Sequence, residues 1–197
     1  AIRTGYHAAM PDHLHTAARC VAPRRRLTGA IIGTLSVLLA LGCTACEKPV
    51  PEGRFLVTIK GERFYLEPAV TQQQLSLGLG GRESIEPNGG MIFYFPVPQR
   101  REFVMRDCLV PIDLAFTDDT GRVIALHTMT VEPPRAEGET DMDYELRLKR
   151  YPSRYRVRVA IEVAGGTWAR LGLEEGDRVS FDADKLKDLA RRADPAR

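Results

Sequence analysis

The chain has 197 residues and a formal net charge of +2, enough length for one ordinary domain and a terminal extension. Residues 1–42 hold five arginines and one aspartate, so the remainder has 23 basic and 25 acidic residues and a formal net charge of −2. The positive charge therefore belongs to the N-terminal segment, and the rest of the chain lacks the basic character that favours nucleic-acid binding.

The N-terminal segment predicts export. Three arginines at residues 24–26 precede an apolar run over residues 27–41, and small residues follow it. This arrangement is typical of a secretory signal, and the run of about 15 residues is shorter than a bilayer span. An uncleaved N-terminal anchor is the alternative. We predict a lipoprotein-type signal peptide over residues 1–42.

The predicted cleavage point identifies a lipidation site. Residues 39–43 resemble a bacterial lipobox, in which Cys43 carries the lipid and becomes the mature N-terminus. Residues 43–53 then form a tether, because two prolines discourage regular structure there. No aspartate follows Cys43, so we expect a lipid-anchored, periplasm-facing position in the cell envelope, with the outer membrane favoured.

The first part of the domain predicts a hairpin and a helix. Residues 54–60 and 63–67 are rich in β-forming residues and flank a short turn that contains a glycine. Residues 71–79 predict a short helix, because Thr71 and Gln74 have the spacing of a capping box.

Four apolar segments with strand character follow, over residues 91–95, 101–107, 112–117 and 122–129. Pro96 and Pro98 are expected to end the first of them, because proline cannot donate a hydrogen bond to a sheet. The turn between the last two segments contains two aspartates and a glycine, which indicates a hairpin.

The remaining segments continue this pattern. Residues 132–153 are polar and charged, which predicts a surface excursion or flap. Residues 156–163 alternate between valine or isoleucine and mostly charged residues, which predicts a strand with Glu162 on its solvent side. Residues 165–172 predict a short helix, and residues 173–181 a turn and a last strand.

The expected architecture is a mostly-β sandwich or barrel with two or three short helices. Its domain spans residues 54–181, and residues 182–197 form a helical tail. Within that tail, Leu186 and Leu189 are too few to dock the helix firmly.

Several motifs resemble the DUF192 family in the same order along residues 54–181. They include Gly90-Met91-x-Phe93-x-Phe95, Phe103-x-Met105, Pro111-Ile112-Asp113-x-x-Phe116, Ile161-Glu162-Val163-Ala164-Gly165-Gly166 and Gly176-Asp177-Arg178-Val179. The resemblance implies a compact β-rich sandwich that is often exported. It implies no established activity.

The candidate site lies where two apolar segments meet polar residues. Met105, Arg106 and Asp107 end one predicted strand close to Asp113 in the next. Arg106 beside a carboxylate suits an anionic or sugar-like ligand, or forms a salt bridge at a strand end. Asp113 either lines a cleft or accepts backbone N–H groups. Asp107 and Asp113 together offer a glycosidase-like pair.

Other catalytic and metal chemistry has little support. After residue 42, His127 is the only histidine, so a clustered zinc site is not expected. His127 is expected to be a hydrogen-bonded strand residue and Cys108 a small buried side chain. We therefore expect no cofactor and no metal.

The sequence favours a non-catalytic module that binds a small polar or carbohydrate-like ligand through Met105, Arg106, Asp107 and Asp113. A factor for protein interaction or envelope maintenance is one alternative, and a carboxylate-dependent glycan hydrolase is another. The expected partners are the membrane, through the lipid, and a small polar ligand or an envelope protein. We expect a monomer.

Overall fold

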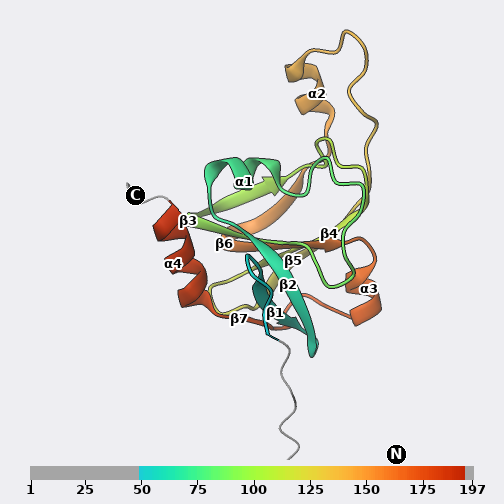
Figure 1. The fold of residues 1–197 in the computed structure, drawn as a ribbon. Coiled ribbons are helices and arrows are strands. Elements are labelled where there is room, and N and C mark those ends of the chain that lie inside the picture. The colour runs from blue at the N-terminus through green and yellow to red at the C-terminus, as the bar shows by residue number, and fades with distance from the viewer. Residues whose placement is uncertain (1–48, 194–197) are drawn as a thin grey trace, which may run out of the picture. The chain divides into compact units, whose positions relative to one another are not determined.

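The computed structural model describes residues 49–193, which form seven strands and four helices (Figure 1). The strands are β1 (Phe55–Ile59), β2 (Glu62–Ala69), β3 (Met91–Phe103), β4 (Ile112–Thr117), β5 (Val123–Met129), β6 (Tyr151–Ala164) and β7 (Val179–Phe181). The helices are α1 (Gln72–Leu77), α2 (Asp141–Arg147), α3 (Thr167–Leu171) and α4 (Ala183–Ala193). The mostly-β prediction is confirmed, with four helices rather than two or three.

The predicted signal peptide and Cys43 lie outside the described residues. Within residues 49–193, no helix is both long enough and apolar enough to cross a membrane.

All seven strands belong to one sheet in the order β5-β4-β6-β3-β2-β1-β7. Neighbouring strands are antiparallel except for β2 and β3, which are parallel. The two ends of the sheet meet, because residues 121–123 exchange backbone hydrogen bonds of 2.8–2.9 Å with residues 176–179. The sheet is therefore curled into a barrel-like form.

Strand β3 does not end at its prolines, so that prediction was wrong. The register between β3 and β6 shifts between Tyr94 and Gln99, which places Pro96 and Pro98 in an irregular stretch that needs no ladder donors. Arginines of β6 bind the carbonyl groups there: Arg156 Nε donates to Pro98 O at 3.0 Å, and Arg158 donates to Pro96 O.

Both faces of the central strands are buried. One core cluster contains Ile92, Ile161 and Trp168, and a second contains Phe93, Leu114 and Phe116. Since β3, β4 and β6 contribute to both clusters, these strands have no solvent face along much of their length.

The terminal helix α4 is docked, contrary to the sequence-based expectation. Leu186 and Ala190 lie one helical turn apart, are buried, and belong to the first core cluster, with Leu189 packed against it. Two apolar positions plus an alanine therefore suffice to hold this helix. The predicted capping box of α1, formed by Thr71 and Gln74, is present.

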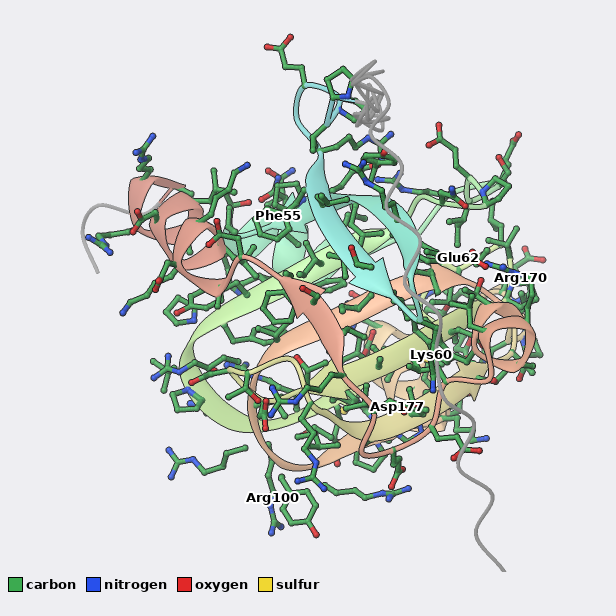
Figure 2. All side chains as sticks on the ribbon, turned by 90° about the horizontal axis from the view of Figure 1, so that it is seen from below. Phe55, Lys60, Glu62, Arg100, Arg170 and Asp177 are labelled. Carbon is green, nitrogen blue, oxygen red and sulfur yellow. The ribbon has the colours of Figure 1, made fainter. Side chains whose placement is uncertain are left out.

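Ion pairs link the first hairpin to the C-terminal part of the domain (Figure 2). Lys60 Nζ lies 2.7 Å from Asp177 Oδ2, and Arg170 Nη1 lies 2.8 Å from Glu62 Oε1. Both pairs are partly exposed, so screening by solvent keeps their contribution to stability small. The hydrophobic clusters therefore provide most of the stability of this end.

Candidate functional site

A cleft of about 660 Å³ opens between the turn after α1, strand β3 and the loop that follows β3. Its walls contain three phenylalanines of β3, the glycine-rich turn at residues 78–81, and residues 104 and 106–108 of the loop after β3. Strand β6 contributes one side chain, that of Glu162.

The phenylalanines form a continuous aromatic wall. Phe93 and Phe103 meet edge to face with ring centroids 5.2 Å apart, and the Phe93 and Phe95 centroids lie 6.4 Å apart. The guanidinium group of Arg101 lies 4.2 Å from the centre of the Phe95 ring. The wall therefore combines an apolar surface with a cation at its edge.

Glu162 is the functional candidate that the sequence analysis placed wrongly. The alternation of β6 predicted a solvent-facing side chain, but Glu162 is only 4% exposed. Its register partners, Met91 on β3 and Leu114 on β4, share its face of the sheet and are buried, so this face of β6 is also covered. A glutamate within an apolar run, between two neighbouring apolar strands, was the signal available in the sequence.

The Glu162 carboxyl group is only partly satisfied. The backbone N–H of Leu79 donates a hydrogen bond to it, whereas Oε2 has no hydrogen-bond partner among the described residues. Burial raises the pKa of Glu162 to about 8, while the Leu79 N–H and the charge of Arg82 oppose that rise. The group is therefore mainly protonated at neutral pH.

The backbone leaves space above this carboxyl group. Gly78 ends α1 with a positive φ of 54°, and a Cβ atom there would lie 3.2 Å from Glu162 Oε2. Glycine at this position thus permits the turn and keeps a side chain from crowding the carboxyl group on its cleft side.

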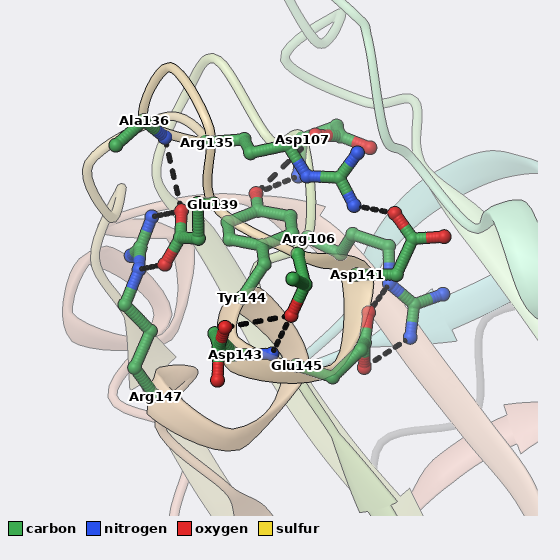
Figure 3. A network of polar contacts seen from close by, with 11 residues as sticks. Arg106, Asp107, Arg135, Ala136, Glu139, Asp141, Asp143, Tyr144, Glu145 and Arg147 are labelled. Atoms are coloured by element: carbon green, nitrogen blue, oxygen red, sulfur yellow. Dashed lines mark hydrogen bonds and ion pairs between the residues drawn. The ribbon is translucent and has the colours of Figure 1, made fainter.

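Arg106 and Asp107 also line the cleft, and both contact α2 (Figure 3). Arg106 forms a two-point ion pair with Glu145, in which Nη2 lies 2.7 Å from Oε2. The Tyr144 hydroxyl donates to Asp107 Oδ1 at 3.2 Å and accepts from the Asp107 N–H at 3.2 Å. The predicted surface excursion is thus fastened to the loop beside the cleft.

The excursion has its own polar framework, also visible in Figure 3. Thr140 caps α2 by accepting from the Asp143 N–H at 3.1 Å, and Arg147 Nε donates to Glu139 Oε1 at 2.6 Å. Arg135 pairs with Asp141. Residues 135–147 therefore form a pre-organised unit rather than an irregular loop.

The structure does not bring all four predicted site residues together. Arg106 and Asp107 line the cleft, but Met105 is 1% exposed and belongs to the second core cluster. Asp113 is fully buried and does not line the cleft. Its Oδ2 accepts the backbone N–H of Trp168 at 2.8 Å, in the first turn of α3. Asp113 thus has the structural role that the sequence analysis left open.

The contacts of His127 and the burial of Cys108 fit structural roles for both residues. His127 Nε2 lies 2.9 Å from Pro152 O, and its ring packs edge to face against Phe116 and Tyr151. Burial raises the pKa of the Cys108 thiol to about 12, which leaves it protonated and poorly nucleophilic. Within residues 49–193, no group of three or more His, Cys, Asp or Glu side chains could hold a metal ion.

Two solved structures have a similar fold. One is a proposed transcription regulator from Sinorhizobium meliloti 1021, with 26% identity, a TM-score of 0.52, and coverage of 66% of this chain and 92% of that one. The other is a protein of unknown function from Novosphingobium aromaticivorans DSM 12444, also with 26% identity and a TM-score of 0.52. The match covers 65% of this chain and 84% of the Novosphingobium chain. No curated protein matches the chain.

The DUF192 profile, described as an uncharacterized ACR, matches residues 55–181. That range contains all seven strands and every residue of the cleft. The match covers well over half of the chain, and the chain belongs to the DUF192 family.

Proposed function

We propose that this domain is a non-catalytic module that binds a small polar ligand in the Glu162 cleft. The observation that carries this proposal is the unpartnered Oε2 atom of a buried glutamate that lines an open cavity. A buried polar atom without a partner costs about 1–3 kcal/mol, so natural proteins seldom keep one without a reason. A bound ligand would supply the missing hydrogen bond.

The size and composition of the cleft support the same function. Its volume of about 660 Å³ falls within the range of small-molecule sites, which usually combine apolar walls with a few polar groups. Here the apolar part is the phenylalanine wall, and the polar part is Glu162 together with Arg106 and Asp107.

The hydrolase alternative has weaker support. A paired mechanism needs two carboxyl groups that face the same substrate. Asp107 lines the cleft, whereas the carboxyl group of Asp113 is buried against α3. The geometry therefore favours binding over hydrolysis by these two aspartates.

The protein-interaction alternative is favoured by one feature. Met142 and Leu146 lie four residues apart on α2, and each is 72% exposed. Replacing both with serine should abolish cross-linking to a specific envelope protein if α2 is a docking surface. Unchanged cross-linking in that variant would contradict docking through α2.

The envelope location remains part of the proposal, and it rests on the sequence of residues 1–43. Cells grown with a labelled fatty acid should incorporate label into the wild-type chain and none into Cys43→Ala. Equal labelling of the two chains would overturn lipidation at Cys43.

Native mass spectrometry tests the binding function. The full chain, extracted from cell envelopes in mild detergent, should carry a non-covalent mass that is lost on denaturation. Glu162→Ala should lose that mass, whereas Glu83→Ala, which removes an exposed glutamate outside the cleft, should keep it. A wild-type chain that carries no extra mass and binds none of a panel of added polar compounds would overturn the proposal.

A further inference from the structure

The charges that line the cleft balance one another. Arg101 and Arg106 face the same space as Glu102 and Asp107, which gives no net charge when Glu162 is protonated. Three of these four groups are also engaged by the protein. Arg106 is paired with Glu145, Arg101 lies over Phe95 and donates to Val97 O at 3.1 Å, and Asp107 binds Tyr144. The cleft therefore offers little to a strongly charged ligand.

The surroundings of Glu162 favour its neutral form. Met91 and Phe93 face it from β3, Leu114 from β4, and Gly78 from the turn after α1. The titratable groups in the same cleft include Asp107 and Cys108, and burial raises the pKa of the Cys108 thiol, which therefore carries a proton. Arg82 is the cation whose charge acts on Glu162 in the opposite direction, and it forms a two-point pair with Glu67 at 2.6–2.7 Å.

A neutral carboxyl group has one hydrogen-bond donor, its O–H. The Leu79 N–H already occupies an acceptor position of the group, and Oε2 faces the cleft without a partner. A matching ligand atom must then accept a hydrogen bond, as the oxygen of a hydroxyl, an ether or an amide carbonyl does.

The aromatic wall adds a second requirement. Phe103 is only partly buried and lines the cleft in contact with the buried rings of Phe93 and Phe95, and such an aromatic surface suits the flat, apolar face of a ring. A saccharide ring has such a face and carries acceptor oxygens around its edge.

We propose that the ligand is an uncharged saccharide, one of whose oxygens accepts a hydrogen bond from the carboxyl group of Glu162, whose Oε2 atom has no other partner among the described residues. This inference rests on the binding function proposed above and adds the class of ligand. Cationic amino sugars and anionic sugar acids are disfavoured, because the charges of the cleft balance and three of the four charged groups are already engaged by the protein.

Three pyranoses of similar size separate these classes: N-acetylglucosamine is neutral, glucosamine is cationic and glucuronate is anionic. Their binding to the full chain can be compared by ligand-observed NMR at about pH 6, well below the Glu162 pKa of about 8. We expect N-acetylglucosamine to bind at least about tenfold more tightly than either charged sugar, the effect of losing one good hydrogen bond.

The dependence on pH and two variants identify Glu162 as the cause. Binding to the wild-type chain should weaken as the pH rises through about 8, because the ionised group loses its donor. Glu162→Gln should bind with little dependence on pH, since an amide keeps a donor. Glu162→Ala should lose binding at every pH.

A pair of glycine variants controls for backbone effects. Gly78→Ala and Gly61→Ala both place a side chain at a positive φ, and Gly61 lies outside the cleft. A Cβ atom at Gly78 would lie 3.2 Å from Glu162 Oε2, whereas nothing lies within 4 Å of a Cβ atom at Gly61. We expect Gly78→Ala to weaken sugar binding at least about tenfold relative to Gly61→Ala.

The outcomes separate this inference from the proposed function. Tighter binding of glucosamine or of glucuronate would overturn the ligand class but leave a binding module. A non-covalent mass in the native spectrum that is not a saccharide, with no sugar binding, would do the same. A chain that carries no extra mass and binds neither the sugars nor any of the other polar compounds in the panel would overturn both proposals.

Discussion

Replacing Glu162 with glutamine should stabilise the protein in a way that depends on pH. The pKa of Glu162 rises from the ordinary 4.5 to about 8 in the folded chain, because burial disfavours the charged form. Between these values the folded chain keeps a proton that the unfolded chain releases. The free energy of unfolding therefore falls as the pH rises through this window, and glutamine removes that dependence.

The magnitude follows from the size of the pKa shift. A difference of about 3.5 pH units corresponds to roughly 5 kcal/mol at 1.36 kcal/mol per unit. This figure is an upper limit, because the folded chain can relax around the charge. Glu162→Gln should match the wild-type chain near pH 4.5 and exceed it by up to roughly 5 kcal/mol above pH 8.

Urea denaturation at a series of pH values measures this difference. Trp168 is the only tryptophan in the chain and is buried, so its fluorescence reports unfolding. Glu83→Gln, at an exposed position, serves as the matched control and should follow the wild-type pH dependence. Parallel curves for the wild-type chain and Glu162→Gln between pH 5 and pH 8 would refute the reasoning.

Three further predictions concern the framework of the site. Asp113→Ala should destabilise the domain by about 1–3 kcal/mol, because it leaves the buried backbone N–H of Trp168 without its acceptor. Equal thermal stability of the variant and the wild-type chain would contradict this. Gly121→Ala should lower the free energy of unfolding, measured by urea denaturation, far more than Gly138→Ala does. Both residues have a positive φ, but only at Gly121 would a Cβ collide with Val179 O, at 2.1 Å. A double-mutant cycle between Arg106 and Glu145 should give a coupling of about 0.2–1 kcal/mol that decreases with salt, because the pair is partly exposed. A larger coupling that is insensitive to salt would show a desolvated pair instead.

Local chemistry made much of the fold predictable from sequence. Thr71 and Gln74 predicted the start of α1, and the turn before β5 was recognisable from its aspartates and glycine. The continuation of β3 through Pro96 and Pro98 was not predictable, because it depends on a register shift against β6, which lies more than fifty residues later. The docking of α4 likewise depends on a core that other segments provide.

The site was predicted only in part, for a related reason. Arg106 and Asp107 were identified because polar residues follow an apolar strand, which is a local signal. Whether Glu162 and Asp113 face solvent, a cleft or a core depends on which segments pack over each face of the sheet, such as the turn after α1 over Glu162 and α3 at Asp113. A prediction from alternation assumes that one face of a strand is exposed to solvent. This assumption fails for β6, a central strand between β3 and β4 whose two faces are both covered.

The contact between the two ends of the sheet has a consequence for biosynthesis. Strand β1 is made first, yet its outer neighbour β7 comes near the end of the domain, and β7 also reaches residues 121–123. Until about residue 180 has been synthesised, β1 and β5 therefore remain as unpaired edges that can associate with other chains. The domain cannot close on the ribosome segment by segment, and a nascent chain that lacks β7 is the form that a chaperone must protect.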